Sequence, residues 1–142
     1  MRERGSAMLT AVVAVMVLLL ISGILFSFVN NQFKMQTTEE KALKAYYLAD
    51  AGTSYGIAFM VDAVKKGSYT DTDITKDVPN PFGSDYRGEF DVLVSVTHQN
   101  PNPNQVVYNI TATSNGYYPS KADTNHILRT LIKEYSFTMG TP

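Results

Sequence analysis

The stretch that decides the fold is Ala7–Val29, which reads AMLTAVVAVMVLLLISGILFSFV and contains no charged side chain. Its polar residues include Thr10, Ser22 and Ser27, whose hydroxyls can hydrogen-bond back to their own helix. As a helix the stretch is roughly 35 Å long, slightly more than the ~30 Å hydrocarbon core of a bilayer. Because backbone groups in lipid must be satisfied within their own segment, we expect a membrane-spanning helix here.

The composition of the 142-residue chain limits the functions that the part outside the apolar stretch can have. The net charge of −1 gives no basic surplus of the kind that nucleic-acid binding requires. The absence of cysteine excludes disulfides, thiolate metal ligands and a thiol nucleophile. Asn30–Pro142 is left as the water-facing part, with enough residues for one modest core that is stabilised by packing alone.

The charged residues before the apolar stretch predict its orientation. Arg2 and Arg4, together with the amino terminus, outweigh Glu3, so the start of the chain is expected to stay cytoplasmic while the rest is exported. The apolar run is too long for a cleaved secretory signal, and no Ala-x-Ala site precedes Asn30. A permanent single-pass anchor remains possible. A third interpretation uses Gly5, which ends the charged leader directly before the apolar helix with no polar spacer.

This leader resembles the type III signal of type IV pilins and pseudopilins. The resemblance implies cleavage between Gly5 and Ser6 by a prepilin peptidase, which commonly also methylates the new amino terminus, here Ser6. Most pilins that form the body of a filament carry a glutamate at the fifth mature position, where this sequence has Thr10. No acid occurs between Glu3 and Glu39, which is similar to PilX-type minor pilins and the tip pseudopilin GspK. The resemblance therefore implies a minor or initiating subunit.

The helix is expected to continue from about Ser6 to Lys66, because no proline occurs before Pro79 and Gly67 follows two lysines. A first stripe of apolar side chains recurs at helical spacing at Leu43, Tyr47, Ala51, Tyr55 and Phe59. A second stripe contains only small residues, which are Ala42, Ala45, Ala49, Gly52 and Gly56. Two glycines four residues apart in a helix indicate the close approach of another element, and we expect the outer half of the helix to have one face against a sheet.

Within this helix a second motif reads Ala45-Tyr46-Tyr47-Leu48-Ala49-Asp50-Ala51-Gly52. It is similar to the Ala-x-Tyr-x-Ala-Glu-Ala-Gly stretch of PilX-type and related pilin-like proteins, with Asp50 in place of the more usual glutamate. It also follows the expected cleavage site by about forty residues, as it does in that family. We interpret Tyr46, Tyr47 and the small residues as plain helix-on-sheet packing, so the motif is architectural.

The sequence after the helix predicts a loop followed by three strands. Ser68–Gly88 reads as a loop, within which Asp71–Asp77 partly resembles a calcium-binding loop but has Lys76 where glycine belongs, so a solvated acidic loop is preferred. The strands are expected at Phe90–Thr97, Val106–Thr113 and about His126–Thr138, with a hairpin loop at Gln99–Asn104, a turn at Asn115–Gly116 and a polar loop at Ser120–Asn125. Which face of the third strand is buried stays undecided, because its odd-numbered and its even-numbered positions both include apolar residues.

Together these elements predict an α+β fold, in which an antiparallel β-meander covers the outer half of the long helix, as in the pilin-like lollipop. The expected division is a leader at 1–5, a membrane or filament-core helix at 6–29, its outer half at 30–66, and a loop plus β-sheet head at 67–142. His98 and His126 are interpreted as surface histidines rather than metal ligands. No catalytic motif occurs, so we expect neither an enzyme nor a bound cofactor or metal.

The function implied by the resemblance is a minor subunit of a type IV pilus or a related type II secretion or DNA-uptake filament. Its expected partners are other pilins through the N-terminal helix, prepilin peptidase, the membrane platform of the assembly machine and the lipid bilayer. It would reside in the cytoplasmic membrane with its head outside, and then in a surface or periplasmic filament. The alternatives are a permanently anchored extracytoplasmic binding domain and an adhesive tip whose loops at Gln99–Asn104 and Asn115–Asn125 touch a surface; for those loops, ordinary turns are preferred.

Overall fold

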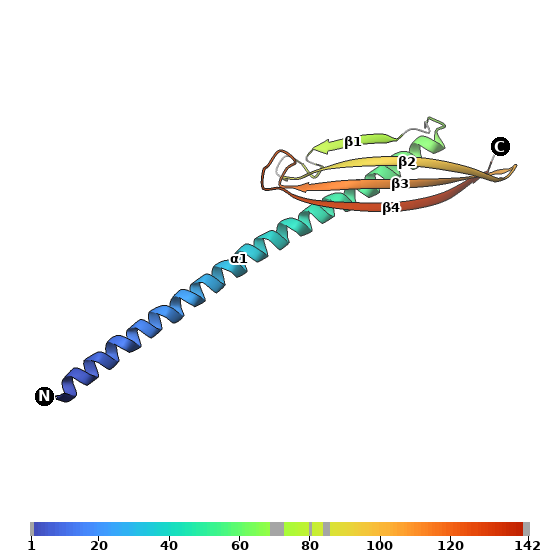
Figure 1. The fold of residues 1–142 in the computed structure, drawn as a ribbon. Helices are drawn as coiled ribbons and strands as arrows, with labels where there is room; N and C mark the ends of the chain where they lie inside the picture. The colour runs from blue at the N-terminus through green and yellow to red at the C-terminus, as the bar shows by residue number, and fades with distance from the viewer. Residues whose placement is uncertain (1, 69–72, 80, 84–85, 141–142) are drawn as a thin grey trace. The chain divides into compact units, whose positions relative to one another are not determined.

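The computed structural model describes residues 2–68, 73–79, 81–83 and 86–140. One helix, α1 (Arg2–Lys65), is followed by four strands, which are β1 (Ile74–Pro79), β2 (Glu89–Asn102), β3 (Gln105–Tyr118) and β4 (Ile127–Gly140) (Figure 1). The chain divides into two units, residues 1–39 and residues 40–142, which are described separately below. The α+β class expected from the sequence is confirmed: a long N-terminal helix contacts a four-stranded antiparallel sheet.

The first unit is helical from Arg2 onward. The helix thus begins four residues before the start expected at Ser6 and includes the charged leader. No proline interrupts it, and Gly23 is tolerated within a run of strong apolar residues. Near the end of this unit the hydroxyls of Thr37 and Thr38 each donate to the carbonyl of Lys34 at 2.9 Å, so their polar groups are satisfied by the helix itself.

The sheet is an antiparallel meander in the order β1-β2-β3-β4. Three of its strands were expected, and each is longer than its sequence signal, since β2, β3 and β4 have 14 residues each. The register of β4 places Tyr135 opposite Ile110, which is buried against the helix, so the odd-numbered residues of β4 face the helix. The buried face of this strand, which the sequence left undecided, is thus the one that carries its odd-numbered residues.

A fourth strand, β1, lies inside the segment expected to be a loop at Ser68–Gly88. It pairs with β2 from Ile74↔Val94 to Pro79↔Glu89. Ile74 and Val78 are half-buried and pack against the core, so a two-residue period brings two apolar side chains inward despite the polar residues between them. Of the segment that resembles a calcium loop, Asp71 and Thr72 lie outside the described residues, and the part from Ile74 onward belongs to this strand.

Two expected turns differ in the structure. The turn expected at Asn115–Gly116 is wrong, because both residues lie within β3, where Gly116 pairs with Phe90 on one side and Arg129 on the other. The hairpin loop expected at Gln99–Asn104 is shorter than predicted, since β2 and β3 pair as far as Asn102↔Gln105, with a register irregularity after Gln99. The polar connection around Ser120–Asn125 does lie between β3 and β4.

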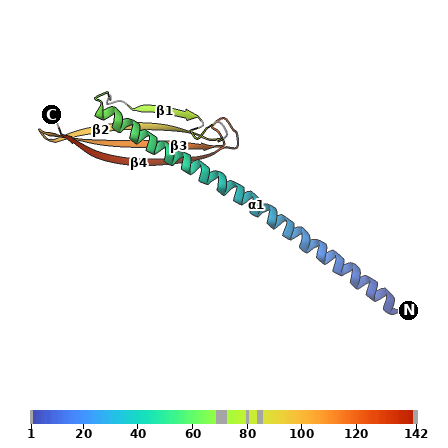
Figure 2. The same ribbon diagram turned by 180° about the vertical axis from the view of Figure 1, so that it is seen from behind.

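The core of the second unit lies between the outer half of α1 and one face of the sheet (Figure 2). Buried helix positions recur three or four residues apart, at Ala45, Leu48, Ala49, Gly52, Thr53, Gly56, Met60 and Val64. The sheet contributes Phe90, Val92, Val94, Val96, Ile110 and Ala112. Among the residues that the structure describes, the buried polar side chains are those of Thr53, which donates to the Asp50 carbonyl at 2.8 Å, and Ser114, which donates to the Asp91 carbonyl at 3.0 Å.

The helix ends where the sequence predicts. Gly67 adopts a φ of 65°, and the amides of Gly67 and Ser68 donate to the carbonyls of Val64 and Ala63, each at 3.0 Å. A residue in the left-handed region followed by such bonds is the usual way to satisfy the last carbonyls of a helix. Helix α1 therefore ends at Lys65, one residue before the expected Lys66.

Candidate functional site

The apolar segment of α1 is the first candidate surface. Every large apolar side chain from Met8 to Val29 is exposed, with values between 47% and 73%. Within the described part of the chain, α1 is the single helix long and apolar enough to span a membrane, with a mean hydropathy of 2.9 in its most apolar window. Water disfavours apolar surface by ~25 cal/mol per Å², so a continuous surface of this kind needs an apolar medium or a partner. The helix is thus suited to cross a bilayer once.

The junction expected to be cleaved lies immediately before this segment. Gly5 and Ser6 are part of α1, so the Gly5–Ser6 bond is helical in the uncut chain; the side chains of residues 1–6 lie outside the described part. Thr10 is exposed in the next turn of the same helix, about 7.5 Å further along its axis than Gly5. The resemblance to pilins would place an acid at this position, where Thr10 carries a neutral hydroxyl.

The Ala45–Gly52 motif forms the beginning of the helix–sheet contact. Ala45, Leu48 and Ala49 are fully buried. A β-carbon added to Gly116 of β3 would collide with the Ala45 carbonyl oxygen and lie 2.5 Å from the Ala49 amide nitrogen. The strand backbone therefore lies directly against the helix backbone, and this distance requires small residues on both elements.

The two helix glycines extend this close contact toward the end of α1. A β-carbon on Gly52 would collide with the Ser114 hydroxyl oxygen, and one on Gly56 would lie 2.7 Å from a methyl group of Val94. Gly88 allows the same proximity before β2, since its β-carbon would lie 2.6 Å from Leu48 Cδ1. The small-residue stripe predicts this approach correctly, and its physical basis is contact with the sheet.

The two tyrosines of the motif do not pack against the sheet, contrary to our expectation. Tyr46 is 44% and Tyr47 58% exposed, and their rings meet edge to face at 5.9 Å. Leu43 and Tyr55, which belong to the first apolar stripe, are also exposed, although the Tyr55 ring meets that of Phe90 on β2 at 6.1 Å. The small stripe lies against the sheet because only small side chains allow two backbones to approach this closely.

Asp50, the acid of the motif, connects the helix to β4. Its Oδ1 lies 2.7 Å from Lys133 Nζ, and the same ammonium is 3.5 Å from the Ser54 hydroxyl. The two side chains are 42% and 40% exposed, so their attraction is screened by water and contributes about 0–1 kcal/mol. The pair therefore orients the helix on the sheet more than it stabilises the fold.

A second polar contact lies where the helix enters the sheet. Lys44 Nζ is 2.6 Å from Glu40 Oε1, 3.4 Å from the Tyr118 hydroxyl and 4.9 Å from the centre of the Tyr118 ring. The hydrogen bond from Lys44 lowers the pKa of Glu40, and the same bond raises the pKa of Lys44. Burial raises the pKa of Tyr86, whose ring lies 6.1 Å from that of Tyr118.

A cavity of about 310 Å³ lies at one end of the sheet, on residues of β1, β2 and β3 and the connection before β4. Its polar lining centres on Asp91, which accepts hydrogen bonds from Asn115 Nδ2 at 2.8 Å, the Tyr117 hydroxyl at 3.0 Å and Lys121 Nζ at 3.1 Å. Glu89 accepts from Ser120 and from the Lys121 amide. The carboxylates thus hold the connection between β3 and β4 in place.

The charges of this cavity alter two pKa values. Burial first, and then the hydrogen bond to Asp91, raise the pKa of Tyr117. The hydrogen bond to Asp91 raises the pKa of Lys121. Both groups are held in the protonated form at neutral pH, so neither is prepared to accept a proton from a substrate.

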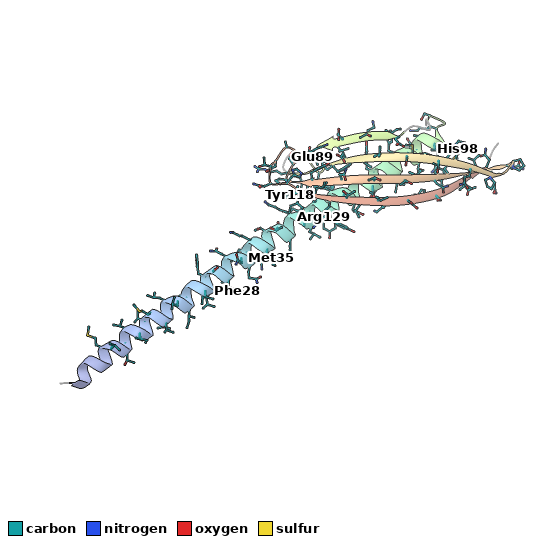
Figure 3. All side chains as sticks on the ribbon, viewed as in Figure 1. Phe28, Met35, Glu89, His98, Tyr118 and Arg129 are labelled. Atoms are coloured by element: carbon teal, nitrogen blue, oxygen red, sulfur yellow. The ribbon has the colours of Figure 1, made fainter. Side chains whose placement is uncertain are left out.

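The two histidines lie in different parts of the head. His98 is exposed on β2, with its ring 6.2 Å from that of Tyr108, at the opposite end of the sheet from Glu89 (Figure 3). His126 instead lies beside the cavity: its Nδ1 is 2.6 Å from the Asp123 carbonyl, and its ring meets at 5.6 Å that of Tyr117, which donates to Asp91. Among the described residues, no group of three or more histidines or acids is placed to hold a metal ion.

No family model, curated protein or solved structure matches this chain. The resemblance to pilin-like proteins therefore depends on the leader, the apolar helix, the motif and the architecture, a long N-terminal apolar helix packed on a small antiparallel sheet. Sequence reasoning missed two features, the contact of Gly116 with the helix and the network around Asp91. The second left a weak signal, since Asp91 stands in a strand whose neighbouring positions are apolar.

Proposed function

We propose that this chain is a minor pilin-like subunit of a type IV pilus or of a related secretion or DNA-uptake filament. The observation that supports it most strongly is the combination, in a single helix, of a fully exposed apolar segment and the Ala45–Gly52 motif packed on a sheet. A membrane anchor needs only the first of these features. The leader that ends at Gly5 adds a third, independent of the other two.

The proposed mechanism is an exchange of surroundings for the apolar segment. In the cytoplasmic membrane its side chains contact lipid; in the filament they contact the apolar helices of neighbouring subunits, so the same surface stays out of water in both states. Because Thr10 is neutral, the segment carries no buried charge that needs a partner when it enters or leaves lipid. A subunit of this kind suits assembly, priming or the tip of a filament more than its repeating body.

The first step of this proposal is tested by mass spectrometry of the membrane-extracted chain. In cells with active prepilin peptidase, the protein is expected to begin at Ser6 with a methylated amino group. Gly5→Leu should keep Met1 and lose assembly into the filament. Gly23→Leu is the matched control, because it introduces the same side chain at a helix glycine with nothing within 4 Å of its added β-carbon, and it should be processed normally.

The permanent single-pass anchor is the competing outcome of this experiment. It has the same hydropathy and the same head, but it needs no cut at the junction. If the unmodified chain keeps Met1 in the presence of active peptidase, and Gly5→Leu is indistinguishable from it in location and function, the pilin-like proposal is refuted in favour of the anchor.

A further inference from the structure

The two faces of the sheet are covered unequally. The outer half of α1 packs on one face, called here the helix side, which carries Phe90, Val92 and Ile110. On the opposite face, called the outer face, the covering found in the described part of the chain is the connection between β3 and β4, whose Lys121 ammonium lies 5.3 Å from the centre of the Tyr117 ring. Figure 2 shows α1 in front of the sheet, whereas Figure 1, from the opposite side, shows the strands in front.

The charged side chains of the strands are divided between these two faces. Neighbouring residues of a strand point to opposite faces. Because Val78 pairs with Phe90 and Tyr135 with Ile110, the even-numbered residues of β1 and β2 and the odd-numbered residues of β4 lie on the helix side. The acidic residues of the four strands all lie on the outer face, and they are Asp77, Glu89, Asp91 and Glu134. The basic residues all lie on the helix side, and they are Lys76, Arg129 and Lys133.

The helix side carries a positive surplus. From the start of the second unit, every acid of α1 already has a basic partner, and these pairs are Glu40–Lys44, Asp50–Lys133 and Asp62–Lys66. The cations left without an ion pair among the residues described are Lys41, Lys65, Lys76 and Arg129. The nearest charges of the first unit, Lys34 and Glu39, are of opposite sign and do not change this balance.

The outer face carries a negative surplus. Asp77 and Asp91 are directly opposed in the register of β1 and β2, and like charges in this arrangement cost stability. Lys121 offsets one of them, since its Nζ lies 3.1 Å from Asp91 Oδ2, and Glu134 has no ion pair within the described ranges. The cavity that Asp77 and Asp91 line leaves room for a further cationic side chain. The remaining charged residues lie in connections and are assigned to neither face; they are Asp73, Arg87 and Asp123.

Both faces also expose apolar side chains. On the outer face Leu93 and Ile132 flank Thr113 in one cross-strand row, and Ile132 is 63% exposed. On the helix side Leu43 and Tyr47 are exposed on α1. Contact between these two groups would remove apolar surface from water, and the charges around them would be of opposite sign.

The chain therefore carries both halves of a complementary pair. A second copy, displaced without rotation, sets its basic helix side on the acidic outer face of the first. Two copies related by a two-fold axis would instead bring like faces together, acid against acid or base against base. Charge thus favours a heterologous contact, in which each copy uses a different face toward each neighbour.

We propose that the heads of this protein associate in this heterologous manner, with the helix side of one copy on the outer face of the next. The apolar side chains of α1 meet Leu93 and Ile132 of the neighbour, and the cations beside the helix are attracted to its Asp77 and Glu134. Because the contact leaves one unused face at each end, it joins copies in a row. The inference concerns the heads alone, and it assumes neither cleavage of the leader nor entry into a filament.

Cross-linking between single-cysteine variants of the full chain, in an excess of detergent micelles, tests the proposal. The chain contains no cysteine, so each introduced thiol is unique. Ala58→Cys places a thiol on the exposed side of α1, and Thr113→Cys places one on the outer face. With a short bismaleimide, a mixture of the two variants should give severalfold more dimer than either variant alone. Asn104→Cys, exposed between β2 and β3, is the matched control, and with Ala58→Cys it should give no dimer above background.

Charge variants test the complementarity of the two faces. Asp77→Lys with Glu134→Lys reverses the outer face, and Lys76→Glu with Arg129→Glu reverses the helix side. Each double variant alone should lose about tenfold in self-association by sedimentation velocity, and an equimolar mixture should recover it, because each then meets the opposite charge on the other. Self-association of the unmodified chain should weaken with salt, which shortens the Debye length from ~10 Å at 0.1 M to ~3 Å at 1 M. Near-ultraviolet circular dichroism checks that each variant is folded.

Several results would overturn the proposal. As much dimer from one cysteine variant alone as from the mixture would show that like faces meet. Association that salt does not weaken, or mixed charge variants that stay apart, would remove the electrostatic argument. A chain that remains monomeric also refutes it, and if its outer face then binds an oligolysine peptide, the occupant is a different, basic protein. None of these outcomes bears on the cut expected after Gly5, so failure here is separate from failure of the proposed function.

Discussion

The contact between the backbones of helix and strand makes Gly116→Ala the most informative single substitution. The added methyl group would collide with the carbonyl oxygen of Ala45, lie 2.5 Å from the amide nitrogen of Ala49 and 2.9 Å from Leu48 Cβ. Two of these atoms are helix backbone, so no rotamer change can relieve the contact. The strand and the helix must move apart instead.

The expected change in unfolding free energy is the sum of two effects of opposite sign, overpacking and a gain from removing glycine's extra conformational freedom. Overpacking of a filled core costs about 1–3 kcal/mol, and collision with backbone belongs at the upper end of that range. Replacing glycine within a strand returns about 0.5–1 kcal/mol of conformational entropy. The net loss of unfolding free energy is therefore about 2–2.5 kcal/mol, which lowers the Tm of a head of this size by about 8–20 °C.

Thermal unfolding of the full chain in detergent, followed by near-ultraviolet circular dichroism, measures this loss. All nine tyrosines lie outside the apolar segment, so the signal reports on the head. Gly140→Ala is the control, because its added β-carbon would lie 3.9 Å from the Asn104 carbonyl oxygen, and it should change stability by less than about 0.5 kcal/mol. If the two variants are equally stable, the proposed backbone contact is wrong.

Three further outcomes follow from neighbouring contacts. Gly52→Ala should cost about 1–3 kcal/mol, and Ser114→Gly in the same chain should recover part of it, because the added methyl meets the Ser114 side chain; additive losses in a urea double-mutant cycle would contradict this. Asp50→Asn should cost no more than about 1 kcal/mol, with the difference from wild type shrinking in high salt, since its pair with Lys133 is partly exposed; a salt-independent loss would point to another cause. The pKa of Tyr117 is raised above its ordinary 10.0, so the folded head holds this phenol proton more tightly than the unfolded chain does. Stability should therefore be full below that value and fall as pH rises through the raised pKa, and urea titrations should show a shallower alkaline fall for Tyr117→Phe.

The helix and three of the strands were predictable because each has its own local period. The α1 stripe of small residues even indicated a close neighbour, since glycines four apart serve no purpose in an isolated helix. The aromatic residues of the motif were misleading: Tyr46 and Tyr47 look like core residues, yet both are exposed. A sequence does not reveal which of two apolar stripes a sheet will choose, because that choice depends on how closely the two backbones approach.

Gly116 and β1 show the limit of local patterns. Asn115-Gly116 has the composition of a turn, and only the presence of the helix backbone beside it explains the glycine. The β1 segment has three consecutive polar residues, Thr75, Lys76 and Asp77, and so lacks the alternation that predicts a strand; its strand character comes from pairing with β2. Both features are consequences of tertiary contact. The junction at Gly5–Ser6, in contrast, was found from the sequence, and its processing stays a prediction.

The glycines of the helix–sheet contact also have a mechanical consequence. Moving α1 along its axis by one residue would turn a different face toward the sheet and bring larger side chains to the positions of Gly52 and Gly56. The helix therefore cannot slide or rotate beneath the sheet in small steps while the head remains folded. A pulling force on the helix at Glu40 would reach all four strands together, and the head would move as one body or unfold.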